Sequence, residues 1–328
     1  MTFKYNNVYL NETATVCGPV EREGPLKKYF DKSYEDMYFG EKSFEKAEIK
    51  LVKDSLVILL RKSGLTNKDI DLLVGGDLLN QIVASCYGSC GVGKSFVGVY
   101  GACSSSVLAM IIASNFIEGN FISNAIVEVS SHNSASENQF RNPVEYGAPK
   151  KDSSTFTSTG AAACLLSNKK SNIKVDCSTL GKIVDYSQND VNDMGRVMAP
   201  AVYETLTKHF EETGRDPSYY DLILTGDLGK YGKNIIKEYM SKDRYELDNY
   251  NDCGVMLYDL EKQKEVHAGG SGPVCSALVN FGLIYDELKK KKLKKVLLIA
   301  TGALFSPTII HQGENIYSIA HAISLEVI

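Results

Sequence analysis

The sequence lacks the features of secreted and membrane-spanning chains. Its first ten residues have no basic start followed by an apolar core, so neither a secretory signal nor a transit peptide is predicted. The longest mostly apolar stretch, residues 107–117, contains Ser114 and Asn115 and is much shorter than the roughly 20 residues that cross a bilayer. We therefore expect a protein made in the cytoplasm that meets any membrane only at its surface.

The sequence also lacks an excess of one charge. Its 36 basic and 40 acidic side chains give a formal net charge of −4, which offers no support for nucleic-acid binding. The eight cysteines have no paired spacing, which indicates reduced thiols, and no metal site is predicted. No proline-rich or glycine/serine-rich linker divides the chain, so we expect its parts to pack against each other.

What the sequence does contain is an internal repeat. A short apolar run ends in Gly-Asp-Leu at Asp77, and a similar run ends in Gly-Asp-Leu at Asp227, 150 residues later. Each run follows a predicted helix, over residues 44–62 and 198–212, and each helix is followed by a glycine suited to the left-handed residue that closes a helix. The repeat therefore involves whole helix-then-strand units.

Strands and helices alternate in both parts of the chain. Four short apolar runs are predicted strands: residues 96–100, 125–129, 255–258 and 296–300. Helices are predicted after Cys103 and over residues 274–288, with Pro273 at the first turn of the second one. This alternation favours an α/β fold made of two copies of one motif, residues 1–172 and 173–328, divided near Asn172.

Residues 88–95 satisfy the phosphate-loop pattern Gly-x-x-x-x-Gly-Lys-Ser. A phosphate loop needs a strand before the first glycine and a helix after the lysine. Here a helix is predicted before the pattern and a strand after it. We interpret the segment as a glycine-rich turn.

Cys103 is the candidate nucleophile. It lies at a predicted strand-to-helix junction, where free helix amides and the helix dipole favour a thiolate and lower the pKa of the thiol. The alternative is a small residue that packs under the following helix. His267, in the matching glycine-rich loop of the second half, is the candidate base, and a histidine satisfied within a loop is its alternative.

Three further features have weaker interpretations. Asp77 and Asp227 each precede a predicted helix and are interpreted as N-caps, with a carboxylate lining a site as the alternative. The polar residues from His132 to Arg141 follow a buried strand and are either ligand contacts or a surface loop. The lysine-rich run at residues 288–295 is either a solvated helix end or a contact for anionic lipid or an acidic partner.

The segment Gly101-Ala-Cys-Ser-Ser-Ser106 and the duplicated halves resemble the thiolase and ketosynthase superfamily, whose nucleophilic cysteine opens a buried helix. The loop at His267 is similar to the loop that carries the catalytic histidine of that superfamily. More closely, the chain resembles the stage V sporulation protein AD family of spore-forming bacteria over nearly its whole length. The blocks that carry this resemblance include Gly75-Gly-Asp-Leu-Leu-Asn-Gln81, Ser130-Ser-His-Asn133, Thr225-Gly-Asp-Leu-Gly229 and His267-Ala-Gly-Gly-Ser-Gly272.

The resemblance implies a thiolase-like fold, with two pseudo-duplicated α/β halves and packed sheets in a layered α-β-α-β-α core. It implies a sporulation and germination protein that binds dipicolinic acid (pyridine-2,6-dicarboxylate) or its calcium chelate. It also implies that the protein supports uptake of dipicolinic acid into the spore, or its release from the spore, together with other membrane proteins of the stage V sporulation A operon. The expected state is a homodimer that is peripheral at the spore inner membrane.

Two departures from the superfamily pattern bear on catalysis. Where a thiolase carries a second cysteine in a Cys-Gly-Gly-Gly stretch, this chain has Thr301-Gly-Ala-Leu304, so the second acid/base is missing. Pro273 also stands beside the glycine-rich loop where close relatives often have another residue, which alters the local shape of the site.

Two functions therefore compete. The first is a ligand-binding protein without catalysis, whose site contains Cys103, His132, Arg141, Arg196 and His267, because a buried dicarboxylate needs cationic donors. The second is an acyltransferase in which Cys103 is acylated from a coenzyme A thioester and His267 moves the proton. Coenzyme A is the only cofactor considered, and it belongs to the second function alone.

Overall fold

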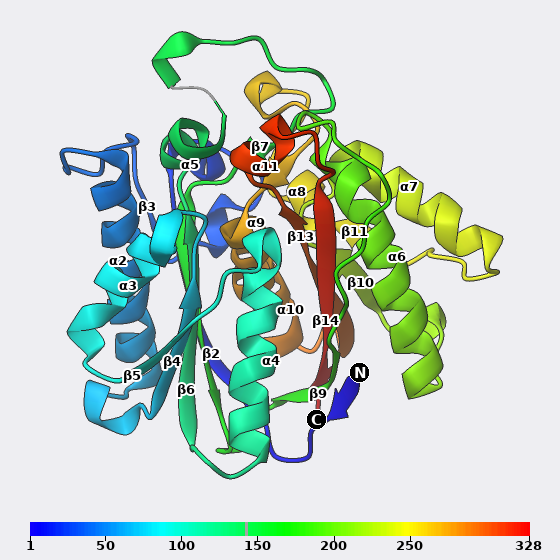
Figure 1. The fold of residues 1–328 in the computed structure, drawn as a ribbon. Helices are drawn as coiled ribbons and strands as arrows, with labels where there is room; N and C mark the ends of the chain where they lie inside the picture. Colours follow the sequence, from blue (N-terminus) through cyan, green and yellow to red (C-terminus); the bar gives the residue numbers. More distant parts are fainter. Residues whose placement is uncertain (142–143) are drawn as a thin grey trace.

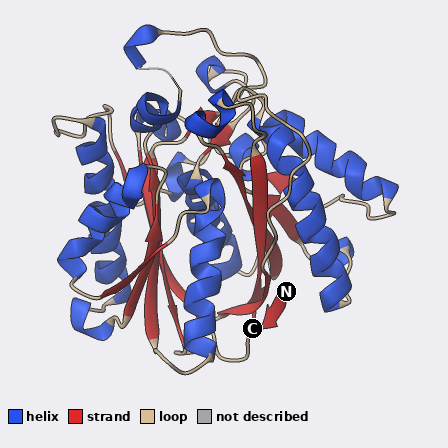
Figure 2. Cartoon of the chain, in the orientation of Figure 1, coloured by secondary structure: helices blue, strands red, loops and turns tan. Residues whose placement is uncertain are grey.

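The computed structural model describes residues 1–141 and 144–328. Two sheets stand side by side, with one layer of helices between them and another on each outer face (Figure 1). Figure 2 shows the same five layers by secondary structure. This arrangement confirms the predicted α-β-α-β-α core.

The first sheet has the strand order β5-β4-β6-β8-β2. Strands β4, β5 and β6 are parallel, and β8 and β2 continue the sheet in antiparallel pairs. The bounds are β2 (Tyr9–Cys17), β4 (Leu72–Gly76), β5 (Ser95–Gly98), β6 (Asn124–Ser131) and β8 (Gly160–Ser167), with the short strands β1 (Thr2–Lys4) and β3 (Lys32–Ser33) beside β9 and β2.

The second sheet repeats this order and these directions as β11-β10-β13-β14-β9. Its strands are β9 (Ile173–Thr179), β10 (Leu222–Thr225), β11 (Tyr250–Asp252), β13 (Lys295–Leu304) and β14 (Tyr317–Val327). The two sheets join through one Cα pair, Tyr9 of β2 with Lys174 of β9. The shared strand order supports a division of the chain at Asn172, between β8 and β9, which stays a prediction.

Helices fill the three other layers. The outer layers hold α2 (Phe44–Ser63) and α3 (Val83–Ser89) on the first sheet, and α6 (Met194–Thr213) and α7 (Gly229–Lys242) on the second. The middle layer holds α4 (Ser105–Glu118) and a continuous segment made of α9 (Pro273–Leu278), the π-helix Val279–Ile284 and α10 (Tyr285–Lys289). Short helices α1 (Pro19–Arg22), α5 (Asn133–Phe140), α8 (Cys253–Met256) and α11 (Pro307–His311) lie in the connections.

Local sequence explains the long outer helices. Ser43 caps α2 by accepting a hydrogen bond from the amide of Lys46, and leucines such as Leu51 and Leu59 recur at helical spacing on its buried face. The predicted glycine closures are confirmed, since Gly64 has φ 70° and Gly214 has φ 68°.

One predicted strand is wrong. Residues 255 and 256 belong to the helical turn α8 and residues 257 and 258 follow it, while the strand of this region is the earlier β11. The Asp252 carboxylate accepts a hydrogen bond from the amide of Val255, which caps a helical turn at that point. Four apolar residues are too few for periodicity to distinguish a strand from a helical turn.

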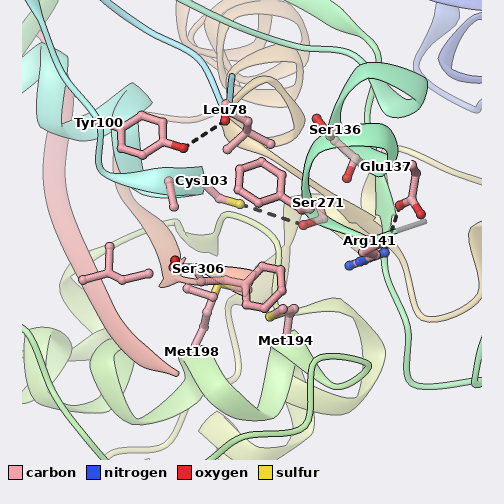
Figure 3. Close-up of a pocket in the computed structure, with 16 residues that line it drawn as sticks. Leu78, Tyr100, Cys103, Ser136, Glu137, Arg141, Met194, Met198, Ser271 and Ser306 are labelled. Atoms are coloured by element: carbon pink, nitrogen blue, oxygen red, sulfur yellow. Dashed lines mark hydrogen bonds and ion pairs between the residues drawn. The ribbon is translucent and has the colours of Figure 1, made fainter. Parts of the chain in front are cut away.

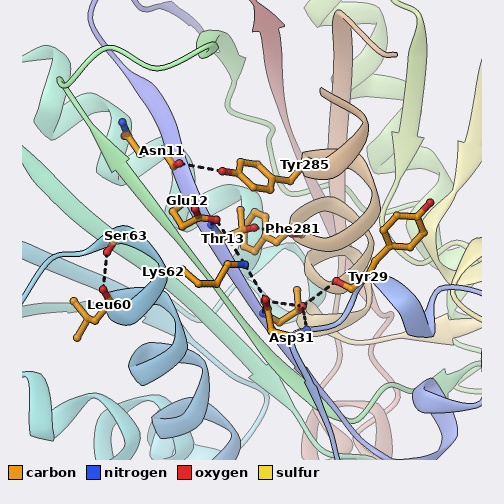
Figure 4. Close-up of polar contacts among 11 residues, drawn as sticks. Asn11, Glu12, Thr13, Tyr29, Asp31, Leu60, Lys62, Ser63, Phe281 and Tyr285 are labelled. Carbon is orange, nitrogen blue, oxygen red and sulfur yellow. Dashed lines mark hydrogen bonds and ion pairs between the residues drawn. The ribbon is translucent and has the colours of Figure 1, made fainter. Parts of the chain in front are cut away.

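The middle layer ties the two halves together. The Thr13 hydroxyl of β2 donates to the Phe281 carbonyl in the π-helix at 2.7 Å, and the Tyr285 hydroxyl donates to the Asn11 carbonyl at 3.0 Å (Figure 4). The apolar cluster between the sheets includes residues of both halves. A helical segment of the second half therefore covers strands of the first half.

Within residues 1–141 and 144–328, none of the helices combines the length and apolar character that a bilayer crossing requires.

Candidate functional site

A pocket of about 260 Å³ lies at the end of the molecule where the carboxyl ends of the parallel strands meet. This is the usual place for a ligand in an α/β fold. Its walls come from both halves: the turn before α4, helix α5, the start of α6 and the segment after β13 (Figure 3). Apolar side chains dominate the lining, among them Leu78, Phe140, Met194, Met198 and Phe305.

Cys103 lies on a tight turn at the wall of this pocket. Ala102 has φ 51°, a left-handed conformation that is strained for a residue with a side chain. Gly302 of β13 makes the turn fit, because a Cβ there would lie 2.4 Å from the Gly101 carbonyl oxygen. The Ser104 hydroxyl donates to that same carbonyl at 2.6 Å. The turn is thus held in place by the neighbouring strand and by its own hydroxyl.

The second half supplies the polar neighbours of Cys103. Strand β12 (Gly270–Ser271) pairs with β7 (Phe156–Thr157) and brings Ser271 to the pocket. The Cys103 Sγ lies 3.9 Å from the Ser271 Oγ (Figure 3). The Ser271 hydroxyl in turn donates to the Asp227 carboxylate at 3.2 Å. A chain of three polar groups therefore runs from the pocket wall into the second half.

The thiol of Cys103 is held neutral. Burial and the nearby negative charge of Asp227 raise its pKa well above the ordinary value. The sequence predicts the opposite direction, from helix amides and the helix dipole. That prediction fails because desolvation and a carboxylate disfavour the thiolate, while one turn of helix offers only partial charges.

The interpretation of Asp227 as an N-cap is wrong. Its carboxylate accepts hydrogen bonds from the Ser271 hydroxyl, the Gly272 amide at 3.2 Å and the Thr301 hydroxyl. Burial raises its pKa to about 6. The amides at the start of α7 donate their hydrogen bonds to the Asp252 carboxylate instead. Asp227 is therefore a buried carboxylate behind the pocket, which was the weaker of the two sequence interpretations.

Arg141 lines the pocket next to a carboxylate. Its guanidinium contacts the Glu137 Oε1 at 3.0 Å (Figure 3), and the Lys150 ammonium reaches the same oxygen at 3.2 Å. Two cations thus share one anion at this wall. Asn142 and Pro143, which follow Arg141, lie outside the described residues.

The structure does not bring His132 into the pocket lining. Its Nε2–H donates to the Met37 carbonyl at 2.8 Å, and its Nδ1 accepts from the amide of Ala135 at the start of α5. Burial lowers its pKa to about 4. His132 is a neutral helix cap whose ring packs on Phe44.

His267 and Arg196 also lie outside the lining of the pocket. His267 closes a short 3-10 turn with φ 58° and forms an isolated bridge with Thr155. Arg196 is exposed on the first turn of α6. Of the five residues predicted to bind ligand, Cys103 and Arg141 line the pocket together.

Sequence reasoning missed the apolar wall and Ser271. Met194 and Met198 lie at the start of α6, which matches α2 over its whole length at the 150-residue offset, but an apolar residue on a helix is more often core than site. The signal for Ser271 was its place in the glycine-rich loop that carries His267. The predicted helix-then-strand order around residues 88–95 is confirmed by α3 and β5, so the phosphate-loop pattern has no phosphate-loop geometry.

Comparison with known proteins decides the family. The model of the family "Stage V sporulation protein AD" matches residues 1–326. The chain belongs to the stage V sporulation protein AD family. A relative in this family, stage V sporulation protein AD of Bacillus subtilis (strain 168), is 42% identical over 320 residues, which cover 97% of this chain and 94% of the relative. The predicted membership in this sporulation family is thereby confirmed.

Solved structures similar to this family member are ketosynthase-like enzymes. The 3-oxoacyl-(acyl-carrier-protein) synthase III of Aquifex aeolicus VF5 is 14% identical, with a TM-score of 0.59 over 97% of this chain and 99% of that chain. A variant of Xanthomonas campestris OleA is 13% identical, with a TM-score of 0.64 over 99% of each chain. At this identity the likeness establishes the fold, and it confirms the thiolase-like architecture.

Proposed function

We propose that this sporulation protein binds dipicolinic acid, free or as its calcium chelate, in the pocket beside Cys103 without chemical turnover. The observation that supports this most is the pairing of an arginine, Arg141, with an apolar and aromatic wall in one pocket. A planar dicarboxylate needs both, because its ring favours apolar contacts and its carboxylates need charged donors.

The wall around Arg141 suits such a ligand. The rings of Phe140 and Phe305 lie 6.0 Å apart between centroids. Arg141 and Lys150 both contact Glu137, so an incoming carboxylate would find two cations against one anion. Hydrogen bonds to charged groups of this kind typically contribute about 1.5 to 3 kcal/mol each.

The state of Cys103 supports binding over catalysis. A neutral thiol is a weak nucleophile, and histidine is absent from the described residues that line the pocket. The buried carboxylate Asp227 disfavours the thiolate further. These features suit a pocket in which the thiol serves as a packing and hydrogen-bonding group.

Acyl transfer from a coenzyme A thioester, with Cys103 as nucleophile and His267 as base, is the second candidate. It is favoured by the strained turn at Ala102, since strain of this kind gathers at reactive positions. It is also favoured by a structural neighbour, an OleA variant with bound lauric acid and lauroyl-CoA, which is 13% identical with a TM-score of 0.58 over 97% of this chain and 99% of that chain.

Calorimetric titration with dipicolinate and with its calcium chelate tests the proposal. Arg141→Ala is expected to weaken binding roughly 10- to 100-fold with little change in melting temperature. Arg196→Ala is the matched control, since Arg196 lies outside the pocket and its loss is expected to leave affinity unchanged. Equal affinity of Arg141→Ala and wild type would remove Arg141 from the site.

Mass spectrometry separates the two candidates. Incubation with acyl-coenzyme A is expected to leave the mass of the Cys103 peptide unchanged. An acyl adduct on Cys103, absent from Cys103→Ser, would overturn the proposal of a binding protein and establish the second candidate.

Membership in the sporulation family supports a proposal for the biological role. We propose that the protein supports the uptake or release of dipicolinic acid with membrane proteins of the same operon, at the surface of the spore inner membrane. A homodimer is the proposed assembly, by resemblance to the thiolase superfamily. Chromatography with light scattering tests the dimer, and co-purification with the operon's membrane proteins tests the partnership.

A further inference from the structure

The end of the molecule opposite the pocket carries the other unexplained feature of the sequence, the lysine-rich run. Helix α10 ends at Lys289 and β13 begins at Lys295, so the middle of the run, residues 290–294, forms the loop between them. Both chain termini and the loop between α4 and β6 lie at this same end (Figure 1). The pocket, near α5 and α11, is at the other end.

Three separate loops meet at this end of the molecule. The Asn168 amide donates to the Ser123 carbonyl at 3.1 Å, which joins the loop after β8 to the loop after α4. The Asn11 side-chain amide donates to the Lys169 carbonyl at 2.8 Å. The C-terminal residues join the loop after β8 to the lysine-rich run, since the Val327 amide donates to the Lys294 carbonyl at 2.8 Å and the Ile328 amide donates to the Asn172 carbonyl at 3.0 Å.

Two of these loops present free ammonium groups. Lys169, Lys170, Lys291 and Lys294 are exposed, and among the described residues their ammonium groups have no hydrogen-bond or ion-pair partner. We call these four lysines, together with Phe121, the lysine-rich face. Phe121, on the loop after α4, is 78% exposed, and its ring meets Phe116 with 6.2 Å between centroids.

Two carboxylates of α10 are less exposed than the lysines that they pair with. The side chains of Asp286 and Glu287 are 30% and 18% exposed, whereas those of their ion-pair partners Lys290 and Lys292 are 58% and 62% exposed. Asp221 turns to the backbone and accepts from the amide of Lys294 at 2.6 Å. The outermost charge of the loop between α10 and β13 is therefore positive, although the whole chain has a net charge of −4. The exposed carboxylates beside the face, Asp71 and Asp221, both accept backbone amides of neighbouring loops.

We propose that the lysine-rich face binds the surface of a membrane that contains anionic phospholipids. Lysines on two loops form a spread of charge that matches a plane of headgroups, and an exposed phenylalanine on the third loop can enter the boundary with the acyl chains. An acidic protein partner would use the lysines but would not account for the exposed ring. The inference deepens the membrane association proposed above and is independent of the ligand.

This geometry orients the molecule. With the lysine-rich face on the membrane, the pocket opens away from the bilayer, toward the aqueous side. A ligand would then enter the pocket from solution, and the membrane partners would be reached from the sides of the protein.

Sedimentation with vesicles tests the proposal. Wild-type protein is expected to bind vesicles of phosphatidylglycerol and phosphatidylcholine, to bind phosphatidylcholine vesicles weakly, and to lose binding as ionic strength rises. The quadruple substitution Lys169→Gln, Lys170→Gln, Lys291→Gln and Lys294→Gln is expected to weaken binding roughly 100-fold at low ionic strength. Phe121→Ser is expected to weaken it roughly tenfold.

A matched control removes four lysine charges outside the lysine-rich face. Lys42, Lys46, Lys53 and Lys237 are exposed on the helical faces or the loop before α2, and their change to Gln is expected to leave vesicle binding within about twofold. Equal loss in the control and the test variant would overturn the proposal, since net charge alone would then explain binding. Retention on immobilised polyglutamate without vesicle binding would also overturn it, in favour of an acidic protein partner.

Dipicolinate calorimetry on the same quadruple variant keeps the two proposals apart. Unchanged ligand affinity with lost vesicle binding supports the lysine-rich face. The quadruple variant is misfolded if it loses vesicle binding and ligand affinity and also has a lower melting temperature. In that case Phe121→Ser provides the test, and unchanged vesicle binding by this folded variant would overturn the proposal.

Discussion

Asp77 and Asp227 follow corresponding strands of the two halves, but their carboxylates accept hydrogen bonds from different kinds of donor. Asp77 uses one oxygen for the amide of Leu79 and the other for the amide of Ser85, both at 2.8 Å. In the second half Asp252, which reaches across from β11, binds the amides of Leu228 and Gly229, and Gly229 corresponds to Leu79 at the 150-residue offset. Asp227 is thereby released to face hydroxyl groups behind Cys103. A duplicated motif can acquire a site residue when a neighbour takes over its structural role.

A second difference lies within the sheets. Gly75 of β4 pairs with Glu128 of β6, while Thr225 of β10 pairs with Ile299 of β13. The first half therefore buries a carboxyl group where the second half buries an aliphatic side chain. Glu48 and Asp77 lie near enough to Glu128 that their charges oppose one another, and burial raises the pKa of all three.

The largest expected effect concerns Glu128. Burial raises its pKa to about 8, against about 4.3 in an unfolded chain, so the folded protein keeps a proton that the unfolded chain loses. The free energy of unfolding should therefore fall as pH rises through this window, by at most about 1.4 kcal/mol per pH unit from this group. Urea unfolding at a series of pH values measures the slope.

Glu128→Gln should flatten that slope, because the amide mimics the protonated acid. The variant should gain up to about 4 kcal/mol relative to wild type between pH 5 and 8. Glu23→Gln, at an exposed carboxylate, should leave the slope unchanged. If the free energy of unfolding changes with pH equally in Glu128→Gln and in wild type, the Glu128 carboxyl group is not protonated in the folded protein.

The next effect concerns the free energy of unfolding, and it tests which of the three aspartates bind backbone amides. Asp77→Asn and Asp252→Asn should each lower the free energy of unfolding by about 2 to 3 kcal/mol, because both oxygens accept backbone amides and an asparagine must turn a donor toward one of them. Asp227→Asn should cost less than about 1 kcal/mol, since the Thr301 and Ser271 hydroxyls can rotate to accept. Equal losses in all three variants would contradict the comparison.

The smallest effect concerns the reactivity of the Cys103 thiol. Removal of the negative charge in Asp227→Asn should lower the pKa of Cys103 and speed its alkylation by iodoacetamide roughly tenfold near neutral pH. Mass spectrometry of the Cys103 peptide separates it from the exposed Cys86 and Cys90. Asp77→Asn should leave the rate unchanged, and a similar acceleration in that variant would show that loosened structure, not charge, exposes the thiol.

Much of the fold could be predicted from local sequence. Gly64 and Gly214 close their helices as expected, and the buried runs in β6 and β13 are predicted as strands because, apart from Glu128, both faces of each run are apolar. The 150-residue repeat pointed to two copies of one motif. These features depend on neighbours in the chain, where patterns are directly visible.

The site was harder to predict because its contacts join distant segments. Cys103 and Arg141 were singled out by position, and both line the pocket. Nothing near Asp227 in the sequence indicates that Asp252, 25 residues later, takes its capping role. The state of Cys103 likewise depends on burial and on a carboxylate more than 120 residues away in sequence.

The helical segment across residues 273–289 has a consequence for synthesis on the ribosome. The strands of the first half emerge early, but the segment that anchors to Thr13 through Phe281 is made about 270 residues later. At typical bacterial elongation rates of about 5 to 20 residues per second, the inner face near β2 and β8, beyond the part that α4 covers, stays uncovered for roughly 10 to 50 s. During that interval the nascent chain depends on chaperones or on delayed folding, so the protein reaches its native state only after nearly all of the chain has been made.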